Sequence, residues 1–177
     1  MMAERKGAWM QTFTGRAFWP MDPQPEEVCI EDIAHALSHI CRYVGHCLRF
    51  YSVAEHSVLL YRFAPAEFKK AALMHDSPEA YVVDLPRPLK PFIRSYKYIE
   101  RDVAEAIQKK FDLPNICPPE VAKLDARILQ DEQQQNMSSP PMSWSTQALE
   151  PLGVKLEFWS PQVAEVMFLS AYREAFL

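Results

Sequence analysis

Apolar residues recur at spacings of three and four along most of the chain, a pattern that predicts helices. In segment 30–41 one apolar face is formed by Ile30, Ile33, Ala34, Leu37 and Ile40. Ser52 is followed three residues later by Glu55, a capping-box arrangement that predicts the start of a second helix at 53. Further helices are expected over 65–83, 89–111, 118–136 and 161–176.

The segment 9–19, WMQTFTGRAFW, has aromatic and β-branched residues on both sides of a Thr-Gly pair, which predicts a short β-hairpin. The predicted fold is therefore an all-α helical bundle with a short N-terminal hairpin. With 177 residues, 49% of them hydrophobic, the chain is expected to form one domain over 1–177. The long connection 137–161 has no predicted helix, and a lid, an oligomer contact and a disordered linker are all compatible with it.

Composition narrows the classes of partner and compartment. A net charge of -4 gives no indication of nucleic-acid or membrane-surface binding. No apolar run approaches the ~18 residues of a membrane span, and the N-terminus lacks the apolar core of a signal peptide. The four cysteines form no CxxC pair, which favours reduced thiols and a cytoplasmic protein. The four glycines are far apart, so a phosphate would be bound by side chains, helix N-termini or metal.

The segment 73–88, LMHDSPEAYVVDLPRP, places His75, Asp76 and Glu79 within an apolar helical pattern. Burying an imidazole and carboxylates without partners is costly, so these groups must be paired or must bind a cation. One interpretation is a buried His–Asp hydrogen bond that joins two helices. The other is a metal site, which requires ligands from elsewhere in the chain.

His56 and Asp125 are the candidates for those further ligands, because each lies among apolar neighbours inside a predicted helix. Aspartate is a poor helix former, and Asp125 has no capping position to explain it. Two imidazoles and two carboxylates suit manganese, cobalt, iron or zinc better than calcium, and they leave positions for water and a substrate oxygen.

Four motifs in this order resemble those of the HD-domain metal-dependent phosphohydrolases: VAEHS, HDSPEA, VVDLPRPLK and KLDARI. The chain most resembles the 5′-deoxynucleotidase branch and small HD proteins of phages and prophages, some of which are deoxynucleoside triphosphohydrolases. The resemblance covers about residues 10–135 and includes FTGRAF and ICRYVGH. It implies a helical bundle of the HD type and a bound divalent ion of cobalt, manganese, zinc, iron or magnesium.

The resemblance also implies roles for individual residues. It implies that the metal ligands are His56, His75, Asp76 and Asp125. Glu79 and Asp84 would be the acid/base and water-orienting carboxylates, and Arg42 would bind the substrate phosphate. In the nucleotidases a tryptophan follows that arginine, whereas Tyr43 follows it here.

Two further sets of basic residues have open interpretations. A stripe at helical spacing, either a solvated face or a phosphate-binding surface beginning at Lys90, is formed by Lys90, Arg94, Lys97 and Arg101. His46 lies near the expected pocket and is a candidate substrate contact. His35 and His39 have a spacing that can bind metal, but the sequence offers no partner, which favours packed or surface histidines.

The expected function is a metal-dependent enzyme that hydrolyses 5′-phosphates of deoxynucleotides, first of all a deoxynucleoside 5′-monophosphatase. The alternatives are a dNTP triphosphohydrolase that releases triphosphate, a non-catalytic regulatory or host-interaction protein on the same scaffold, and a purely structural metal. The partners expected are a small-molecule deoxynucleotide and further copies of the chain in a homo-oligomer, with no nucleic acid and no membrane.

Overall fold

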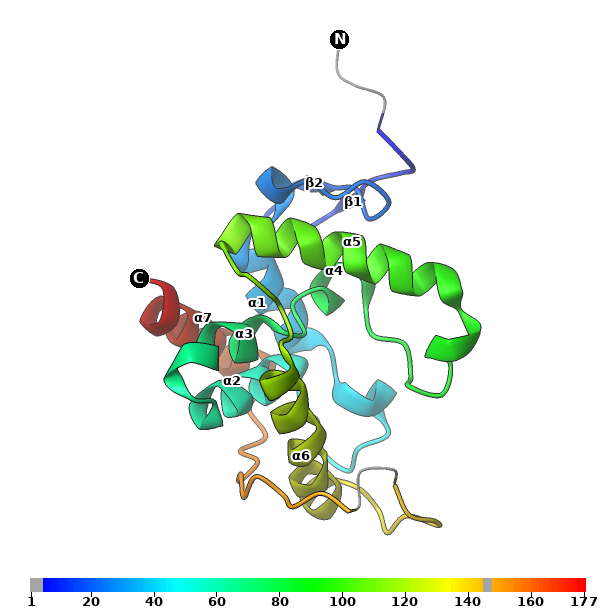
Figure 1. Cartoon of the computed structure of the whole chain (residues 1–177), viewed down its shortest axis with the longest axis vertical. Coiled ribbons are helices and arrows are strands. Elements are labelled where there is room, and N and C mark those ends of the chain that lie inside the picture. Colours follow the sequence, from blue (N-terminus) through cyan, green and yellow to red (C-terminus); the bar gives the residue numbers. More distant parts are fainter. Residues whose placement is uncertain (1–4, 145–147) are drawn as a thin grey trace.

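The computed structural model describes residues 5–144 and 148–177, and they form mostly helices (Figure 1). A two-stranded antiparallel hairpin, β1 (Met10–Gln11) and β2 (Ala17–Phe18), pairs Met10 with Phe18. The helices are α1 (Ile30–His39), α2 (Val53–Phe63), α3 (Lys69–Met74), α4 (Glu79–Val82), α5 (Arg94–Phe111), α6 (Pro119–Asn136) and α7 (Pro161–Phe176). Short 3-10 turns are η1 (Pro25–Glu27), η2 (Arg42–Gly45), η3 (Ala66–Phe68) and η4 (Lys90–Phe92). The predictions of an all-α fold and of the hairpin are confirmed. None of the described helices combines the length and the apolar character needed to cross a membrane.

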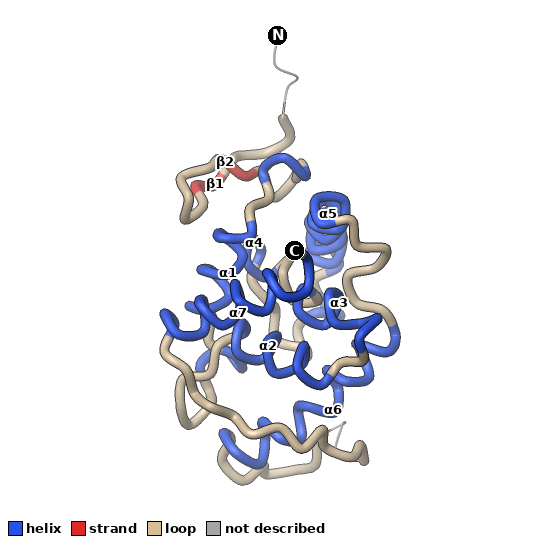
Figure 2. The backbone as a smooth tube through the Cα atoms, turned by 90° about the vertical axis from the view of Figure 1, so that its left-hand side faces the viewer, coloured by secondary structure: helices blue, strands red, loops and turns tan. Residues whose placement is uncertain are grey.

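Helix α2 lies at the centre of the bundle and is buried along almost its whole length, as expected for a helix with small or apolar residues on every side. It packs against α3 and α7, while α1 packs against α7 and α4. Figure 2 shows α1, α7 and α2 side by side, with the hairpin beyond α1. The main core between these helices and α5 includes Ile33, Leu37, Val58, Leu73, Ile107 and Phe168.

A second core lies between α2 and α6 and is closed by the segment 151–159, which we call the strap. Val154 and Leu156 of the strap are buried against Tyr51, Leu60 and Ile128. The side-chain amide of Gln135 on α6 donates to the Val154 carbonyl at 2.8 Å and accepts from the Leu156 N–H at 3.0 Å. Part of the predicted 137–161 connection is thus a packed segment. Its residues 145–147 lie outside the described part of the chain.

The capping box predicted at α2 forms only in part. Ser52 Oγ accepts a hydrogen bond from the Glu55 N–H at 3.0 Å, as predicted. The Glu55 carboxylate instead accepts from three backbone N–H groups of the strap, those of Glu157 and Phe158 at 2.8 Å and of Trp159 at 2.7 Å. A fully buried carboxylate therefore joins α2 to a segment about a hundred residues away in sequence.

We expect Glu55→Ala to lower the free energy of unfolding by about 3 kcal/mol, because three charge-assisted hydrogen bonds are lost inside the protein. Glu157→Ala is the matched control on the same strap. Its carboxylate pairs with Arg62, and the two side chains are 44% and 38% exposed, so we expect a loss below about 1 kcal/mol. Urea denaturation of both variants measures the difference, and equal losses would show that Glu55 does not hold the strap.

The helix predicted over 65–83 is interrupted, and that prediction is wrong in its middle. Helix α3 ends at Met74, and α4 begins at Glu79. Proline at position 78 has no N–H, and its ring would clash with the carbonyl of Met74 in a continuing helix. The Ser77 N–H bonds to that carbonyl instead, at 3.0 Å. His75 and Asp76 consequently lie in a tight turn after α3.

The helix predicted over 89–111 is also divided. Lys90 lies in η4, and Ile93 has a non-helical backbone (φ −117°, ψ 73°) before α5 begins at Arg94. Pro91 in this turn removes a backbone donor that a continuous helix would use. Lys90 is therefore not part of a continuous basic stripe with Arg94. The helices predicted over 30–41, 118–136 and 161–176 are confirmed to within two residues.

Candidate metal centre

Four of the predicted site residues come together at the centre of the bundle. His56 extends from α2, His75 and Asp76 from the turn after α3, and Asp125 from α6. His56 Nε2 lies 3.3 Å from His75 Nε2, 3.2 Å from Asp125 Oδ1 and 3.6 Å from Asp76 Oδ2. His75 Nε2 lies 3.2 Å from Asp76 Oδ2 and 3.9 Å from Asp125 Oδ1.

Three of these five distances, those of 3.2, 3.2 and 3.3 Å, match the edges of a metal coordination shell, and the other two are 3.6 and 3.9 Å. Ligand bonds of 2.0–2.2 Å place neighbouring ligand atoms roughly 3.0–3.5 Å apart. His56, His75 and Asp125 each offer one ligand atom within 4.8 Å of the others, and thus form a group that could hold a metal ion. The oxygen of Asp76 lies beside the same two imidazoles.

The hydrogen bonds of the two imidazoles orient their ligand atoms toward this centre. His75 Nδ1 lies 2.9 Å from the Ala72 carbonyl oxygen, which can only accept, so Nδ1 carries the proton. His56 Nδ1 lies 2.7 Å from Glu132 Oε1. In the neutral form each ring therefore directs the Nε2 lone pair at the other and at the carboxylates. This is the hydrogen-bonding pattern of metal-ligating histidines, and without a cation the facing lone pairs repel.

Glu132, which the sequence analysis missed, is the buried anchor of this arrangement. Its side chain is fully buried on α6 and binds His56, Arg42 and Tyr43 together. Arg42 approaches Glu132 Oε2 with Nη2 at 3.2 Å and Nε at 3.3 Å, and the Tyr43 hydroxyl donates to the same oxygen. One signal was available: Glu132 follows Asp125 by seven residues, two helical turns, and so shares its face of α6.

The charges of the centre favour a cation. Burial and the charge of Arg42 lower the pKa of His56, but Glu132 and Asp125 outweigh them and raise it to about 9. Burial opposes ionisation of Asp76, yet the neighbouring histidines and Arg42 hold its pKa well below the ordinary value. The field that retains a proton on His56 would equally attract a divalent ion.

Arg42 is held at the edge of the centre by an unusual turn. Its Nη1 lies 3.5 Å from Asp76 Oδ2, and its guanidinium is mostly buried. Tyr43 and Val44 follow with left-handed backbone angles, φ 57° and 54°, which are rare for a β-branched residue such as valine. The hydrogen bond from Tyr43 to Glu132 stabilises this turn and thereby fixes the position of the guanidinium.

Glu79 begins α4 just beyond the turn that carries Asp76. Its side chain is buried, and burial together with the charges of Asp76 and Asp84 raises its pKa well above the ordinary value. A carboxylate with a raised pKa is a better proton acceptor near neutral pH. These properties distinguish Glu79 from Asp76, whose pKa is lowered.

The other predicted site residues are engaged differently. Asp84 Oδ1 pairs with Lys90 Nζ at 2.6 Å, and Lys90 also pairs with Glu100 at 3.3 Å. Both members of the Asp84–Lys90 pair are more than one third exposed. His46 is exposed in the turn after Gly45, and its backbone N–H donates to the Tyr43 carbonyl.

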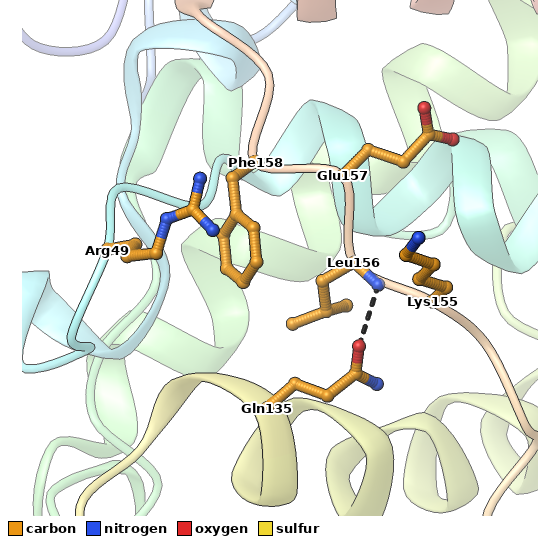
Figure 3. A pocket seen from close by; sticks show the side chains of 6 residues that line it. All are labelled: Arg49, Gln135, Lys155, Leu156, Glu157 and Phe158. Carbon is orange, nitrogen blue, oxygen red and sulfur yellow. Dashed lines mark hydrogen bonds between the residues drawn. The ribbon is translucent and has the colours of Figure 1, made fainter.

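An open cavity of about 670 Å³ lies beside the strap and contains none of the predicted site residues (Figure 3). The Arg49 guanidinium stacks on the Phe158 ring at 3.8 Å, and Gln135 binds the strap backbone. These side chains hold the strap in place. Glu157 contributes one carboxylate to the cavity lining, and no histidine is among the described lining residues, whereas the His/Asp centre brings two histidines and two carboxylates together.

Comparison with known proteins places the chain beside two relatives. The uncharacterized protein YfdR of Escherichia coli (strain K12) is 40% identical over 125 residues, which cover 71% of this chain and 70% of YfdR. An uncharacterized protein of Rhodobacter capsulatus is 35% identical over 128 residues, 67% of this chain and 65% of that protein. The chain therefore spans about two thirds of each relative's length. No protein-family model matches the chain.

Proposed function

The chain belongs to the family of YfdR, and we propose that it is a metal-dependent phosphohydrolase acting on 5′-phosphates of deoxynucleotides, with deoxynucleoside 5′-monophosphates as its first substrates. The observation that carries the proposal is the convergence of two Nε2 lone pairs and two carboxylates at coordination spacing. The order of the motifs supports an HD-type bundle, and the nucleotide part of the proposal rests on that resemblance.

The residues of the centre fit a divalent cation because, with both imidazoles neutral, their proton donors point outward, to Ala72 and Glu132. His56, His75, Asp76 and Asp125 would hold the ion. Bound there, it would lower the pKa of a water molecule and polarise a phosphoryl oxygen. A catalytic role fits better than a purely structural one, because buried Glu79 lies close by without being one of these ligands.

The protein's own groups provide substrate binding and proton transfer. Arg42 holds a permanent positive charge beside Asp76, where it can bind a non-bridging phosphate oxygen. Glu79 accepts the proton of the attacking water, since its raised pKa makes it an effective base. Glu132 acts through His56 and Arg42, so its role is to position the ligand and the phosphate-binding group together.

A monophosphate substrate is favoured over a triphosphate because basic side chains near the site are already paired with carboxylates. A triphosphate would need further cations for its outer phosphates. Lys90 is engaged by Asp84 and Glu100, and Arg101 is paired with Asp102 at 2.7 Å. The basic stripe that would bind a longer polyphosphate is thus interrupted in structure and partly neutralised.

The test of the function is a panel of deoxynucleoside mono- and triphosphates incubated with the protein and manganese or cobalt. We expect inorganic phosphate to be released from the monophosphates. Release of triphosphate would assign the triphosphohydrolase activity instead. Metal binding without turnover on any member of the panel would favour the regulatory protein.

Glu79→Gln is expected to retain the metal while lowering turnover by about 10²–10⁴-fold, the usual contribution of a general base. Elemental analysis and phosphate release on the same preparation measure both properties. Glu105→Gln on α5 is the control, because the Glu105 side chain is 55% exposed and pairs with the exposed Arg101 at the surface. Loss of the metal in Glu79→Gln would reassign Glu79 as a ligand.

A further inference from the structure

A second group of potential ligands lies on the outer face of the bundle, where α1 meets α7. His35 and His39, one turn apart on α1, face Glu165 on α7. Each of the three offers a ligand atom within 4.8 Å of the other two. His35 Nδ1 lies 3.0 Å from Glu165 Oε2. The expectation that the two histidines have no partner is wrong, because Glu165, which lies 126 residues or more beyond them in sequence, packs beside them.

The hydrogen bonds of His39 prepare its other nitrogen for a ligand. His39 Nδ1 lies 2.8 Å from the His35 carbonyl oxygen, an acceptor only, so Nδ1 carries the proton. Neutral His39 therefore has its lone pair on Nε2. An imidazole whose Nδ1–H donates to a backbone carbonyl is the usual arrangement of a metal-ligating histidine, and His75 has the same arrangement in the centre described above.

The His35 ring is also held in one orientation. Phe13 of the hairpin stacks on it with ring centroids 3.6 Å apart and the planes 6° from parallel. The hairpin is itself tied to α1, because Thr14 donates its backbone N–H and its hydroxyl to the buried Asp32 carboxylate at 2.7 and 3.0 Å. Fixed rings lose little conformational entropy on binding, which favours coordination over an equally close but mobile pair of histidines.

We propose that His35, His39 and Glu165 form a second divalent-metal site, one for a transition metal of the zinc class. Two imidazoles and one carboxylate are a common zinc ligand set, and three protein ligands leave one position for water. An ion there would join α1 to α7 directly. Because His35 also contacts the hairpin, the ion would stabilise the hairpin, α1 and α7 as one unit.

The site is independent of the proposed phosphohydrolase centre, since the two share no ligand residue. The two sites are distinguished by the number of zinc ions bound per chain. Equilibrium dialysis and elemental analysis of the full chain measure that number. We expect two ions in the unaltered protein, one in His39→Ala, one in Asp125→Ala and none in the double variant. His46→Ala, which removes an exposed histidine outside both groups, is the matched control and should keep two.

The outcomes distinguish failure of one site from failure of the other. The second site would be overturned if His39→Ala still bound two zinc ions per chain. It would also be overturned if Asp125→Ala alone reduced the number of bound zinc ions to zero. If the unaltered protein binds one zinc ion, and His39→Ala removes it while Asp125→Ala does not, the result would support the second site and contradict the phosphohydrolase centre. Glu165→Gln conserves the side-chain shape and should lower the zinc affinity of the second site at least about 10-fold.

A thermal measurement tests the stabilising role with the first site removed. In Asp125→Ala, zinc at 100 times its dissociation constant should raise Tm by about 5–10 °C. The same addition to the Asp125→Ala, His39→Ala double variant should leave Tm unchanged. An equal rise in both variants would show that zinc acts elsewhere on the protein.

Discussion

Asp125→Ala is expected to release no measurable phosphate from a deoxynucleoside monophosphate and to lose the ion of the His/Asp centre. The metal contributes several kcal/mol to such a reaction, which corresponds to a decrease in turnover of at least about 10³-fold. Asp125 is the sharpest position for this test. Its side chain is 28% exposed on α6, so removing it leaves no large cavity in the core.

The control for Asp125→Ala is Asp102→Ala, which removes an exposed carboxylate that pairs with Arg101. We expect Asp102→Ala to retain its ion and its turnover. Thermal unfolding of both variants verifies that the folds are intact. Full activity in Asp125→Ala would show that phosphate hydrolysis does not use this centre.

Glu132→Ala is expected to reduce stability and metal affinity together. It would leave the Arg42 guanidinium buried with a weakened set of partners, at a cost of about 3–5 kcal/mol of unfolding free energy. His56 would lose the acceptor at 2.7 Å that holds its Nδ1 proton. Loss of such a partner typically weakens metal binding by about 10–100-fold.

Asp131→Asn separates these two effects, because it changes the neighbouring residue of the same helix. The Asp131 carboxylate accepts from the backbone N–H groups of Leu152 and Gly153 at 2.8 and 2.9 Å. We expect Asp131→Asn to lower stability and to leave metal affinity unchanged. If Glu132→Ala also loses only stability, Glu132 does not position His56 for the ion.

Where local patterns determine structure, the helices predicted from the sequence agree with the structure. The apolar period predicted α1, α6 and α7, and Ser160, which lies before Pro161, caps α7 by accepting a hydrogen bond from the Val163 N–H. Errors arose where a proline competed with the apolar period. Pro78 divides the predicted third helix because it has no N–H to donate to the Met74 carbonyl. The Ser77 N–H donates to that carbonyl instead.

The candidate ligand residues were accessible to sequence reasoning because each is a polar group in an apolar setting. Their partners were less accessible. Glu132 lies in the polar run DEQQQN, where a buried carboxylate has no distinct pattern. Glu55 was assigned to a cap, but the strap competes for its oxygens. Glu165 reaches His35 only through the packing of α7 on α1. These contacts are set by tertiary structure.

The most direct test of the metal centre is anomalous diffraction from crystals of the full chain grown with manganese or cobalt. The proposal predicts an anomalous peak about 2.0–2.3 Å from His56 Nε2, His75 Nε2 and a carboxylate oxygen of Asp76 or Asp125. Crystals of a preparation that releases phosphate but shows no anomalous peak between these four residues would contradict it.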